Sequence, residues 1–314
     1  MSTVGELTAH SGSLASDSAN WTDRLVSRLA DYAELTKPRI ALMVLATVSV
    51  GYLLGSAGEW RSLPLFYAAV GILLVAAGSS ALNQWFERDT DRKMVRTRLR
   101  PLPAGRLQPW EVFAFGVTTG IVGGLWLAWT VNLLTAALCL STMILYAGVY
   151  TPLKRYTSFC TAIGAIPGAL PPVLGYTAAG GSLDWTALSL FGILFLWQFP
   201  HFLAIAWMYQ EQYAAAGLRM LPAQFPTPHI TGLMATGYAL ALIPISLLPV
   251  HLGMAGRWYG SAAIVLGLWY LVSSIRFARQ EDRSHARKIL WTSLIYLPTV
   301  LACLTIDHLR LLWS

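Results

Sequence analysis

Nine apolar stretches of this chain are each close to the roughly 20 residues that a helix needs to cross a bilayer. In that solvent every backbone N–H and C=O must be satisfied within the protein, which favours helices. Hydrophobic residues make up 55% of the sequence and charged residues 12%, against roughly 25% charged in a soluble domain. We therefore predict an all-α polytopic membrane protein. The predicted spans are 39–57, 64–86, 110–130, 132–150, 158–178, 185–207, 230–250, 259–276 and 289–306.

Lysine and arginine are distributed unequally between the two ends of these spans. With the N-terminus inside, the leading segment and the loops on its side carry 19 of these residues, and the opposite side carries three. This bias is the positive-inside signal, so we expect the N-terminus and the loop after the second span to face the cytoplasm. Topology and anionic lipid explain the net charge of +7, so no nucleic-acid partner is expected.

The N-terminal segment is predicted to differ from the membrane domain of residues 37–314. Residues 1–19 contain no Lys or Arg and no long apolar run, which argues against a signal or transit peptide, and we expect disorder. Residues 20–36 place apolar side chains at helical spacing and are predicted to form an amphipathic helix on the membrane surface. The three cysteines lie within predicted spans at unrelated spacings, which indicates neither a disulfide framework nor a zinc site.

Ionisable side chains are concentrated at the end of the second span. Asn83, Glu87 and Asp91 are four residues apart, so a helix would stack them along one face. Directly after them come the basic residues Arg92, Lys93, Arg96, Arg98, Arg100 and Arg106. Mg²⁺ binds through few carboxylates plus phosphate oxygens, so this pattern predicts a site for Mg²⁺ and a phosphorylated substrate. The alternative is a solvated helix end whose basic residues only set the topology.

Two further regions carry polar residues within or beside apolar spans. Lys154 and Arg155 follow the fourth span, where they could meet a diphosphate or only anchor the topology. The fifth span is rich in Gly and Pro, so we expect a kinked or broken helix, which at this depth usually lines a cavity. We therefore expect the helices to surround a central cavity that is open to the cytoplasmic side, where the charged loops lie. In the sixth span, His201 has Gln198 on a similar face and could ligate iron, take a proton or merely pack. Glu211 follows at the cytoplasmic exit, where a surface role competes with metal binding.

These segments together resemble the UbiA-type intramembrane prenyltransferases. The resemblance runs through ELTKPRI, NQWFERDTDRKMVRTRLRPLPAGR, YTPLKRYTSF, GAIPGALPPVLGY and WQFPHFLAIAWMYQEQYAAAGLRMLP. Within that superfamily, TKPR, RTRxRPLPAGR and WQFPHF are similar to the protoheme IX farnesyltransferase (haem O synthase) branch. The resemblance implies transfer of the farnesyl group of farnesyl diphosphate to the 2-vinyl group of haem B, with addition of water. It also implies a bacterial plasma (inner) membrane and haem biosynthesis for terminal oxidases.

The resemblance further implies a role for each polar residue. In the family the first acidic box binds Mg²⁺ and diphosphate, which assigns Mg²⁺ to Asn83, Glu87 and Asp91, with Glu87 in place of the commoner Asp. Gln212 stands where the second box commonly has an acid, so Glu211 would bind metal alone or through water. The implied diphosphate contacts are Arg96, Arg100, Lys154 and Arg155. His201 with Gln198 would position haem or water, and the expected catalytic set is Asn83, Glu87, Asp91, Lys154 and His201.

The implied partners are haem B, farnesyl diphosphate, the lipid bilayer and, for delivery, a haem A synthase or terminal oxidase assembly factors. Aromatic faces such as Trp85, Phe86 or Tyr150 could stabilise an allylic carbocation. The first alternative is a UbiA-type enzyme with a quinone precursor or other aromatic acceptor. A transporter would also have broken helices, although it should show two related halves. A haem-binding assembly protein would explain His201 but not the acidic and basic cluster.

Overall fold

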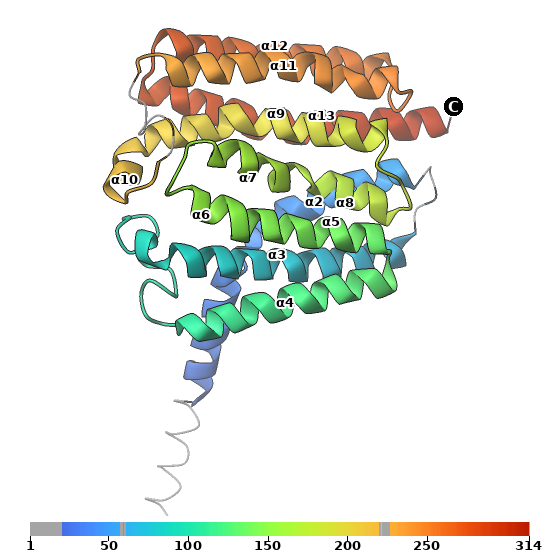
Figure 1. Cartoon of the computed structure of the whole chain (residues 1–314). Helices are drawn as coiled ribbons and strands as arrows, with labels where there is room; N and C mark the ends of the chain where they lie inside the picture. Colours follow the sequence, from blue (N-terminus) through green and yellow to red (C-terminus); the bar gives the residue numbers. More distant parts are fainter. Residues whose placement is uncertain (1–20, 57–58, 60, 220, 222–226, 314) are drawn as a thin grey trace, which may run out of the picture.

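The described fold is built from helices, most of them long and running roughly antiparallel (Figure 1). The structure is a computed structural model that describes residues 21–56, 59, 61–219, 221 and 227–313. In this part of the chain every regular element is helical, and eight helices are long and apolar enough to cross a membrane. The predicted all-α class is therefore confirmed. The predicted disorder of residues 1–19 lies outside the described residues.

Eight predicted spans correspond to continuous helical segments. They are α2 (Pro38–Gly55), α3 (Ser62–Asp91), α4 (Pro109–Thr130), the segment Leu133–Leu153, α9 (Trp185–Met208), α11 (Ile230–His251), α12 (Arg257–Arg279) and α13 (Arg283–Leu312). The segment Leu133–Leu153 contains α5 (Leu133–Met143), a π-helix η1 (Ile144–Tyr150) and α6 (Thr151–Leu153). After α9 comes the short α10 (Gln210–Ala215).

The remaining predicted span, 158–178, is broken as its composition indicates. It consists of α7 (Cys160–Ala169) and α8 (Pro171–Ala178), which meet at Leu170. Pro171 and Pro172 lack the backbone N–H that would continue α7, so the hydrogen-bond ladder stops there. The nine predicted spans are thus eight continuous helices and one interrupted pair within the described residues.

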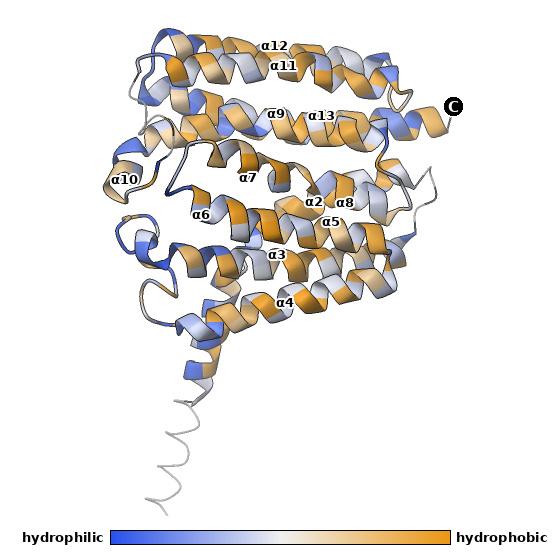
Figure 2. Cartoon of the chain, viewed as in Figure 1, coloured by the Kyte–Doolittle hydropathy of each residue, from blue (hydrophilic) through white to orange (hydrophobic). Residues whose placement is uncertain are grey.

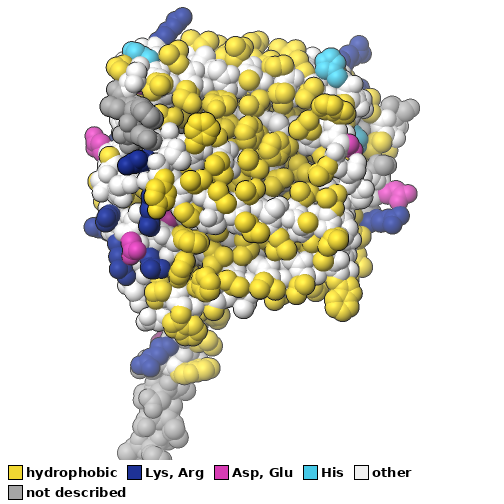
Figure 3. All heavy atoms as spheres, viewed as in Figure 1, with side chains coloured by type: hydrophobic (Ala, Val, Ile, Leu, Met, Phe, Trp, Pro, Cys, Tyr) yellow, Lys and Arg dark blue, Asp and Glu magenta, His cyan; other side chains and the backbone are white. Residues whose placement is uncertain are grey.

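Apolar side chains cover the side of the bundle, and charged residues collect toward its ends (Figures 2 and 3). Trp129 is 91% exposed and Leu133 is 75% exposed. Exposing so many large apolar side chains to water would be costly, so this surface suits lipid. This outer face and the long apolar helices identify a multi-pass membrane protein.

The described part of the N-terminal helix runs over residues 21–35, within the predicted 20–36. Its first turns are exposed, with Trp21 at 65% and Leu29 at 60%, whereas Leu35 at its end is fully buried. Leu35 packs with Leu102 and Leu107 of the loop that follows α3. The end of this helix is therefore part of the fold, while its contact with a membrane surface remains a prediction.

Helices α2 and α8 pack backbone against backbone. A Cβ atom added to Gly51 of α2 would lie 1.8 Å from the Pro172 carbonyl oxygen, and one added to Gly175 of α8 would lie 1.9 Å from that of Val48. Only glycine allows this approach, which is the small-residue packing typical of membrane helices. It holds the broken span against the helix that begins next to the polar site described below.

Replacing Gly175 with Ala should therefore destabilise the fold by about 1–3 kcal/mol, because the backbones of α8 and α2 must move apart at Val48. The measurement is the thermal unfolding midpoint of purified protein in detergent. Gly237→Ala is the matched control, since a Cβ there meets nothing within 4 Å. Equal midpoints for the two variants would contradict the close contact between α2 and α8.

Candidate active site

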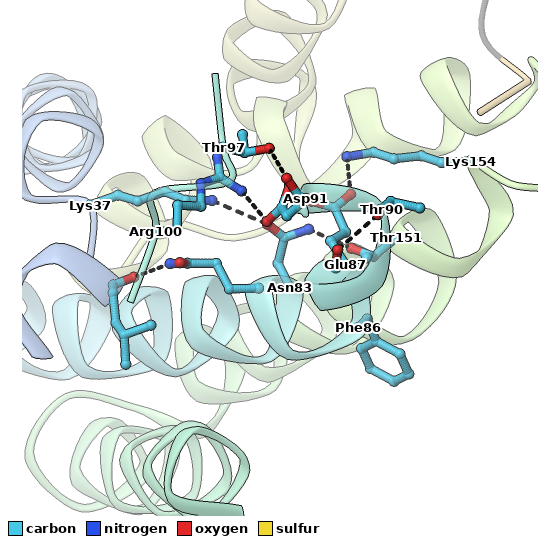
Figure 4. A network of polar contacts seen from close by, with 12 residues as sticks. Lys37, Asn83, Phe86, Glu87, Thr90, Asp91, Thr97, Arg100, Thr151 and Lys154 are labelled. Carbon is cyan, nitrogen blue, oxygen red and sulfur yellow. Dashed lines mark hydrogen bonds and ion pairs between the residues drawn. The ribbon is translucent and has the colours of Figure 1, made fainter. Parts of the chain in front are cut away.

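The last turns of α3 carry the predicted acidic box, and all of its members face one polar network (Figure 4). Sequence periodicity placed the apolar span only to residue 86, but α3 continues to Asp91. Asn83 and Asp91 are 1% and 3% exposed, and the Glu87 side chain is 14% exposed. The three side chains therefore lie within the protein and not on a solvated helix end.

Both carboxylates of this box form short ion pairs. Lys154 Nζ, at the end of α6, lies 2.8 Å from Glu87 Oε1. Arg100 Nη1, from the loop after α3, lies 2.7 Å from Asp91 Oδ2. All four side chains are largely buried, so each pair satisfies charges that would be costly to leave alone.

Asn83 is held from two sides in a defined orientation. Its Nδ2 donates to Thr151 Oγ1 at 3.0 Å, and Thr151 Oγ1 in turn donates to the Tyr146 carbonyl at 2.8 Å. Its Oδ1 accepts from Lys37 Nζ at 3.1 Å. Lys37 immediately precedes α2 and adopts a left-handed backbone conformation with φ of 50°. The amide oxygen of Asn83 is therefore directed at a cation, as the carboxylates of Glu87 and Asp91 are.

The π-helix η1 shapes the wall of the site next to Lys154. The ammonium of Lys154 lies 4.3 Å from the centroid of the Tyr150 ring, and Tyr146 packs 5.4 Å from that ring. Gly164 of α7 makes room for Tyr150, because an added Cβ would lie 2.5 Å from its ring. π-Helical turns often occur at functional sites. Nothing in the sequence distinguished this turn from a regular helix.

Of the three aromatic residues suggested for cation stabilisation, only Tyr150 adjoins the ion pairs. Trp85 packs against Phe113 of α4, 5.1 Å between ring centroids. Phe86 points away from the network in Figure 4. Trp85 lies two residues after Asn83 and Phe86 one residue before Glu87, so both rings turn away from the line that joins Asn83, Glu87 and Asp91 on α3.

Two of the predicted diphosphate contacts lie at the edge of this network. Arg96 is exposed and places its guanidinium 5.7 Å from the Tyr209 ring at the end of α9. Arg155 is exposed and donates to the Phe86 carbonyl at 2.9 Å. Arg96 and Arg155 could therefore reach a ligand only from the solvent-exposed rim of the network, whereas Arg100 and Lys154 are largely buried within it.

Glu211 lies apart from the acidic box on the exposed side of α10. The same short helix buries Tyr213, which packs in one cluster with Met94 of the loop after α3 and Cys160 of α7. The second predicted box is thus attached to the same end of the bundle. Among the described residues, no three His, Cys, Asp or Glu side chains converge in a way that could hold a metal ion.

His201 and Gln198 occupy the inner part of α9 and face different helices. Gln198 is buried and donates to the Ala165 carbonyl of α7 at 2.8 Å. His201 Nδ1 lies 2.7 Å from Ser293 Oγ of α13, and Ser293 donates its own proton to the Leu290 carbonyl. A Ser293 hydroxyl that donates to Leu290 accepts from His201 Nδ1–H, and that tautomer leaves a lone pair on Nε2. The two residues do not form a joint site, although the sequence placed them on similar faces.

The donor chemistry of the acidic box fits a hard divalent cation. Asn83, Glu87 and Asp91 offer one amide oxygen and two carboxylates on one helix face, and Mg²⁺ prefers such ligands when phosphate oxygens complete its shell. Against these two negative charges stand three cations, Lys37, Arg100 and Lys154. The network thus has a surplus of positive charge, which suits an anionic ligand.

Two hollows lie away from this network. One of about 450 Å³ is lined by Leu138, Leu170, Val173 and the first turns of α9, toward the opposite end of the bundle. Another of about 330 Å³ lies between the start of α12 and the end of α13. Neither includes a residue of the acidic box, and the predicted central cavity remains a prediction.

Sequence reasoning missed several members of the network. Thr151 accepts from Asn83, and the Thr97 hydroxyl donates to the Asp91 carbonyl at 3.1 Å. Neither threonine belongs to a sequence pattern that indicated a role at the site. Lys37 stood within the TKPR motif but was assigned no role. Local spacing could not point to its contact with Asn83, because the two residues lie 46 positions apart in the chain.

The chain is similar to a known family over most of its length. The model of the UbiA prenyltransferase family matches residues 44–296. A relative named protoheme IX farnesyltransferase from Solibacter usitatus is 47% identical over 291 residues, which cover 89% of this chain and 99% of the relative. A relative with the same name from Koribacter versatilis is 42% identical over 294 residues, 90% of this chain and 95% of its own length.

Solved structures share the fold. A structure of digeranylgeranylglyceryl phosphate synthase superposes with a TM-score of 0.75 at 19% identity, over 90% of this chain and 99% of that one. A UbiA homolog from Archaeoglobus fulgidus bound to GPP and Mg²⁺ superposes with a TM-score of 0.63 at 17% identity, over 87% and 99% of the two chains. At these identities the likeness establishes the fold alone.

Replacing Lys154 with Met should destabilise the protein by about 3–5 kcal/mol, because the largely buried Glu87 carboxylate loses its partner. The double variant Glu87→Gln with Lys154→Met should recover much of that loss. Thermal unfolding in detergent measures both, with Arg155→Met, at an exposed position, as control. A double variant no more stable than Lys154→Met would show that the ion pair does not account for the effect.

Proposed function

We propose that this chain, which belongs to the UbiA prenyltransferase family, makes haem O by transferring a farnesyl group from farnesyl diphosphate to the 2-vinyl group of haem B with addition of water. The observation that carries this assignment is the match to relatives named protoheme IX farnesyltransferase, at 47% identity over 99% of one of them. The buried acidic and basic network supplies groups suited to a diphosphate.

The proposed setting is a bacterial inner membrane with the network on the cytoplasmic side. The long apolar helices require a bilayer. The excess of Lys and Arg on the side of the loop after α3 supports the orientation, because such loops stay in the cytoplasm. Farnesyl diphosphate would then place its charged head at this end and its chain among the helices.

The proposed binding of diphosphate depends on the groups that already face the acidic box. Asn83, Glu87 and Asp91 would hold Mg²⁺, which when bound supplies positive charge for the departing diphosphate. Arg100 and Lys154 would contact phosphate oxygens from either side of the box, with Arg96 and Arg155 at the rim. Support for a divalent cation includes the A. fulgidus homolog bound to GPP and Mg²⁺. Glu211 would contribute from α10 only through water.

The proposed reaction begins when the bond between C1 of the farnesyl group and the diphosphate oxygen breaks, and the electron pair leaves with the diphosphate. Arg100 and Lys154 stabilise that developing negative charge. The Tyr150 ring, already beside a cation, faces the allylic carbocation that remains. The electrons of the haem vinyl group form the new bond to C1. Water adds to the resulting cation and loses a proton, which gives the hydroxyethylfarnesyl substituent.

His201 is the proposed contact for haem or for that water. In the tautomer whose Nδ1–H donates to Ser293, the free Nε2 can ligate the haem iron or accept a proton from water. Gln198 donates to the Ala165 carbonyl, which holds α7 against α9 and so supports the wall that includes Gly164, while its contact with haem or water stays a prediction. Delivery of haem O to a haem A synthase or terminal oxidase assembly factors is part of the proposal.

Purified protein with haem B, farnesyl diphosphate and Mg²⁺ tests the proposed reaction directly. Mass spectrometry of extracted haem should show a mass gain of farnesyl plus water that is lost when EDTA is added. If folded protein yields no new haem species, quinone precursors and other aromatic acceptors are tested next with the same donor. A prenylated product other than haem O would overturn the acceptor assignment, and no product with any acceptor would overturn the enzymatic one.

Replacing Asp91 with Asn should lower turnover by at least about 100-fold while leaving a folded protein, because a ligand charge is lost where diphosphate departs. Haem O formation measures the effect. Asp89→Asn is the matched control, since the Asp89 side chain is 62% exposed and pairs only loosely with Arg88, at 3.9 Å. Normal turnover by the Asp91 variant would remove the proposed metal role of this residue.

A further inference from the structure

We propose that Lys37 is a cation of the diphosphate site and that the N-terminal helix of residues 21–35 acts as a strap that holds it there. This inference rests on the proposed function of the acidic box. It assigns to Lys37 an exchange of partners, in which its ammonium leaves the Asn83 oxygen for a phosphate oxygen when the substrate binds. The N-terminal helix then serves the active site, besides any contact with a membrane surface.

The first observation is the way Lys37 reaches the site. Its Nζ lies 3.1 Å from Asn83 Oδ1, inside a network whose other ligand oxygens face Arg100 and Lys154 (Figure 4). Each side chain of the box thus has one cation. A lysine that served only to end the preceding turn would have no reason to point at the buried Asn83 amide.

The second observation is the backbone at Lys37. Its φ of 50° is a left-handed conformation, which costs a residue with a Cβ roughly 1–2 kcal/mol. Asn or Gly would adopt this conformation more readily, yet the position holds a long cation. Pro38 follows as the first residue of α2, so the left-handed turn aims the Lys37 side chain back toward α3. Strain of this kind persists where surrounding contacts determine the conformation.

The third observation is the set of contacts that fixes the strap. Gln84, next to Asn83 on α3, donates to the Leu35 carbonyl at 3.1 Å. Arg106 of the loop after α3 pairs with Asp31 and with Glu34, each at 2.9 Å. These contacts come directly before Lys37 in the chain, and Leu35 is buried among apolar residues of the same loop. The strap therefore ties Lys37 to the loop that carries Arg100.

A further pair joins the strap to α4. Arg28 forms an ion pair with Glu111 in the first turn of α4 and also donates to the Arg106 carbonyl at 3.2 Å. The exposed first turns of the helix contribute little to the core, so these polar contacts must hold it in register. A change in the strap should therefore weaken diphosphate binding, because it alters the position of the Lys37 ammonium.

The exchange follows from the charges of the network. Before substrate binds, Lys37 satisfies the Asn83 oxygen and keeps it turned toward the site. An incoming diphosphate would offer negative oxygens to Lys37, and the metal bound with it would replace Lys37 as the cation beside the Asn83 oxygen. The ammonium can then move to phosphate with a strong charge-assisted hydrogen bond, and Asn83 keeps its orientation through Thr151.

The test compares Lys37→Met, Lys37→Arg and the strap variant Asp31→Asn with Glu34→Gln in the haem O assay. Lys37→Met should raise both the KM for farnesyl diphosphate and the inhibition constant of inorganic diphosphate roughly tenfold, as expected for loss of a charged hydrogen bond. The KM for haem B should stay unchanged, and Lys37→Arg should recover most of the loss. Arg39→Met, at an exposed position two residues later, is the matched control.

The strap variant should shift the same two constants in the same direction by a smaller factor. Adding Lys37→Met to it should produce no more than the effect of Lys37→Met alone, because both changes act through one ammonium. An unchanged inhibition constant for diphosphate in Lys37→Met would overturn the proposal. So would an equal rise in the KM for haem B, which indicates a general structural defect.

If the native protein makes no haem O, the proposed function fails but Lys37 can still be tested. Calorimetric titration of inorganic diphosphate with Mg²⁺ into the native protein and Lys37→Met then supplies the comparison. Tighter binding to the native protein, with recovery in Lys37→Arg, supports the proposal. Equal binding to the native protein and Lys37→Met overturns it.

Discussion

The structure of this site depends on the cost of placing charge away from water. Glu87 and Asp91 lie at the end of an apolar helix, where an unpaired carboxylate would be strongly destabilising. Each therefore requires a cation from another segment, and these cations come from the end of α6 and from the loop after α3. The partner of Glu87 lies 67 positions along the chain and that of Asp91 only nine, and together with Lys37 these cations form a network suited to a diphosphate.

The surrounding helices position these partners through close packing. Contact of Gly51 with α8 allows the broken span to lie against α2, and Gly164 allows Tyr150 to turn toward Lys154. The π-helix before Thr151 places that hydroxyl within reach of Asn83. Because the interior is close-packed, the same contacts that stabilise the bundle also fix the orientation of the reactive groups. Stability and the electrostatics of catalysis are thus coupled in one set of side chains.

Sequence patterns predicted the helices well, because hydrophobic length and Gly/Pro content report directly on membrane spans. The break at Leu170 followed from two prolines, and the shared face of Asn83, Glu87 and Asp91 followed from helical spacing. The same periodicity was less useful at the ends of helices. It ended the second span five residues before Asp91, because charged residues interrupt an apolar pattern without interrupting a helix.

By itself, the sequence determined the all-helical membrane class, the acidic box and its family resemblance, because these depend on local spacing and composition. Only the tertiary structure decided which cation meets each oxygen, that Gln198 faces α7 while His201 faces α13, and that Lys37 belongs to the network. Those pairings join residues as many as 92 positions apart. Helical spacing specifies the face on which a side chain lies, but the packing of one helix against another specifies what that face contacts.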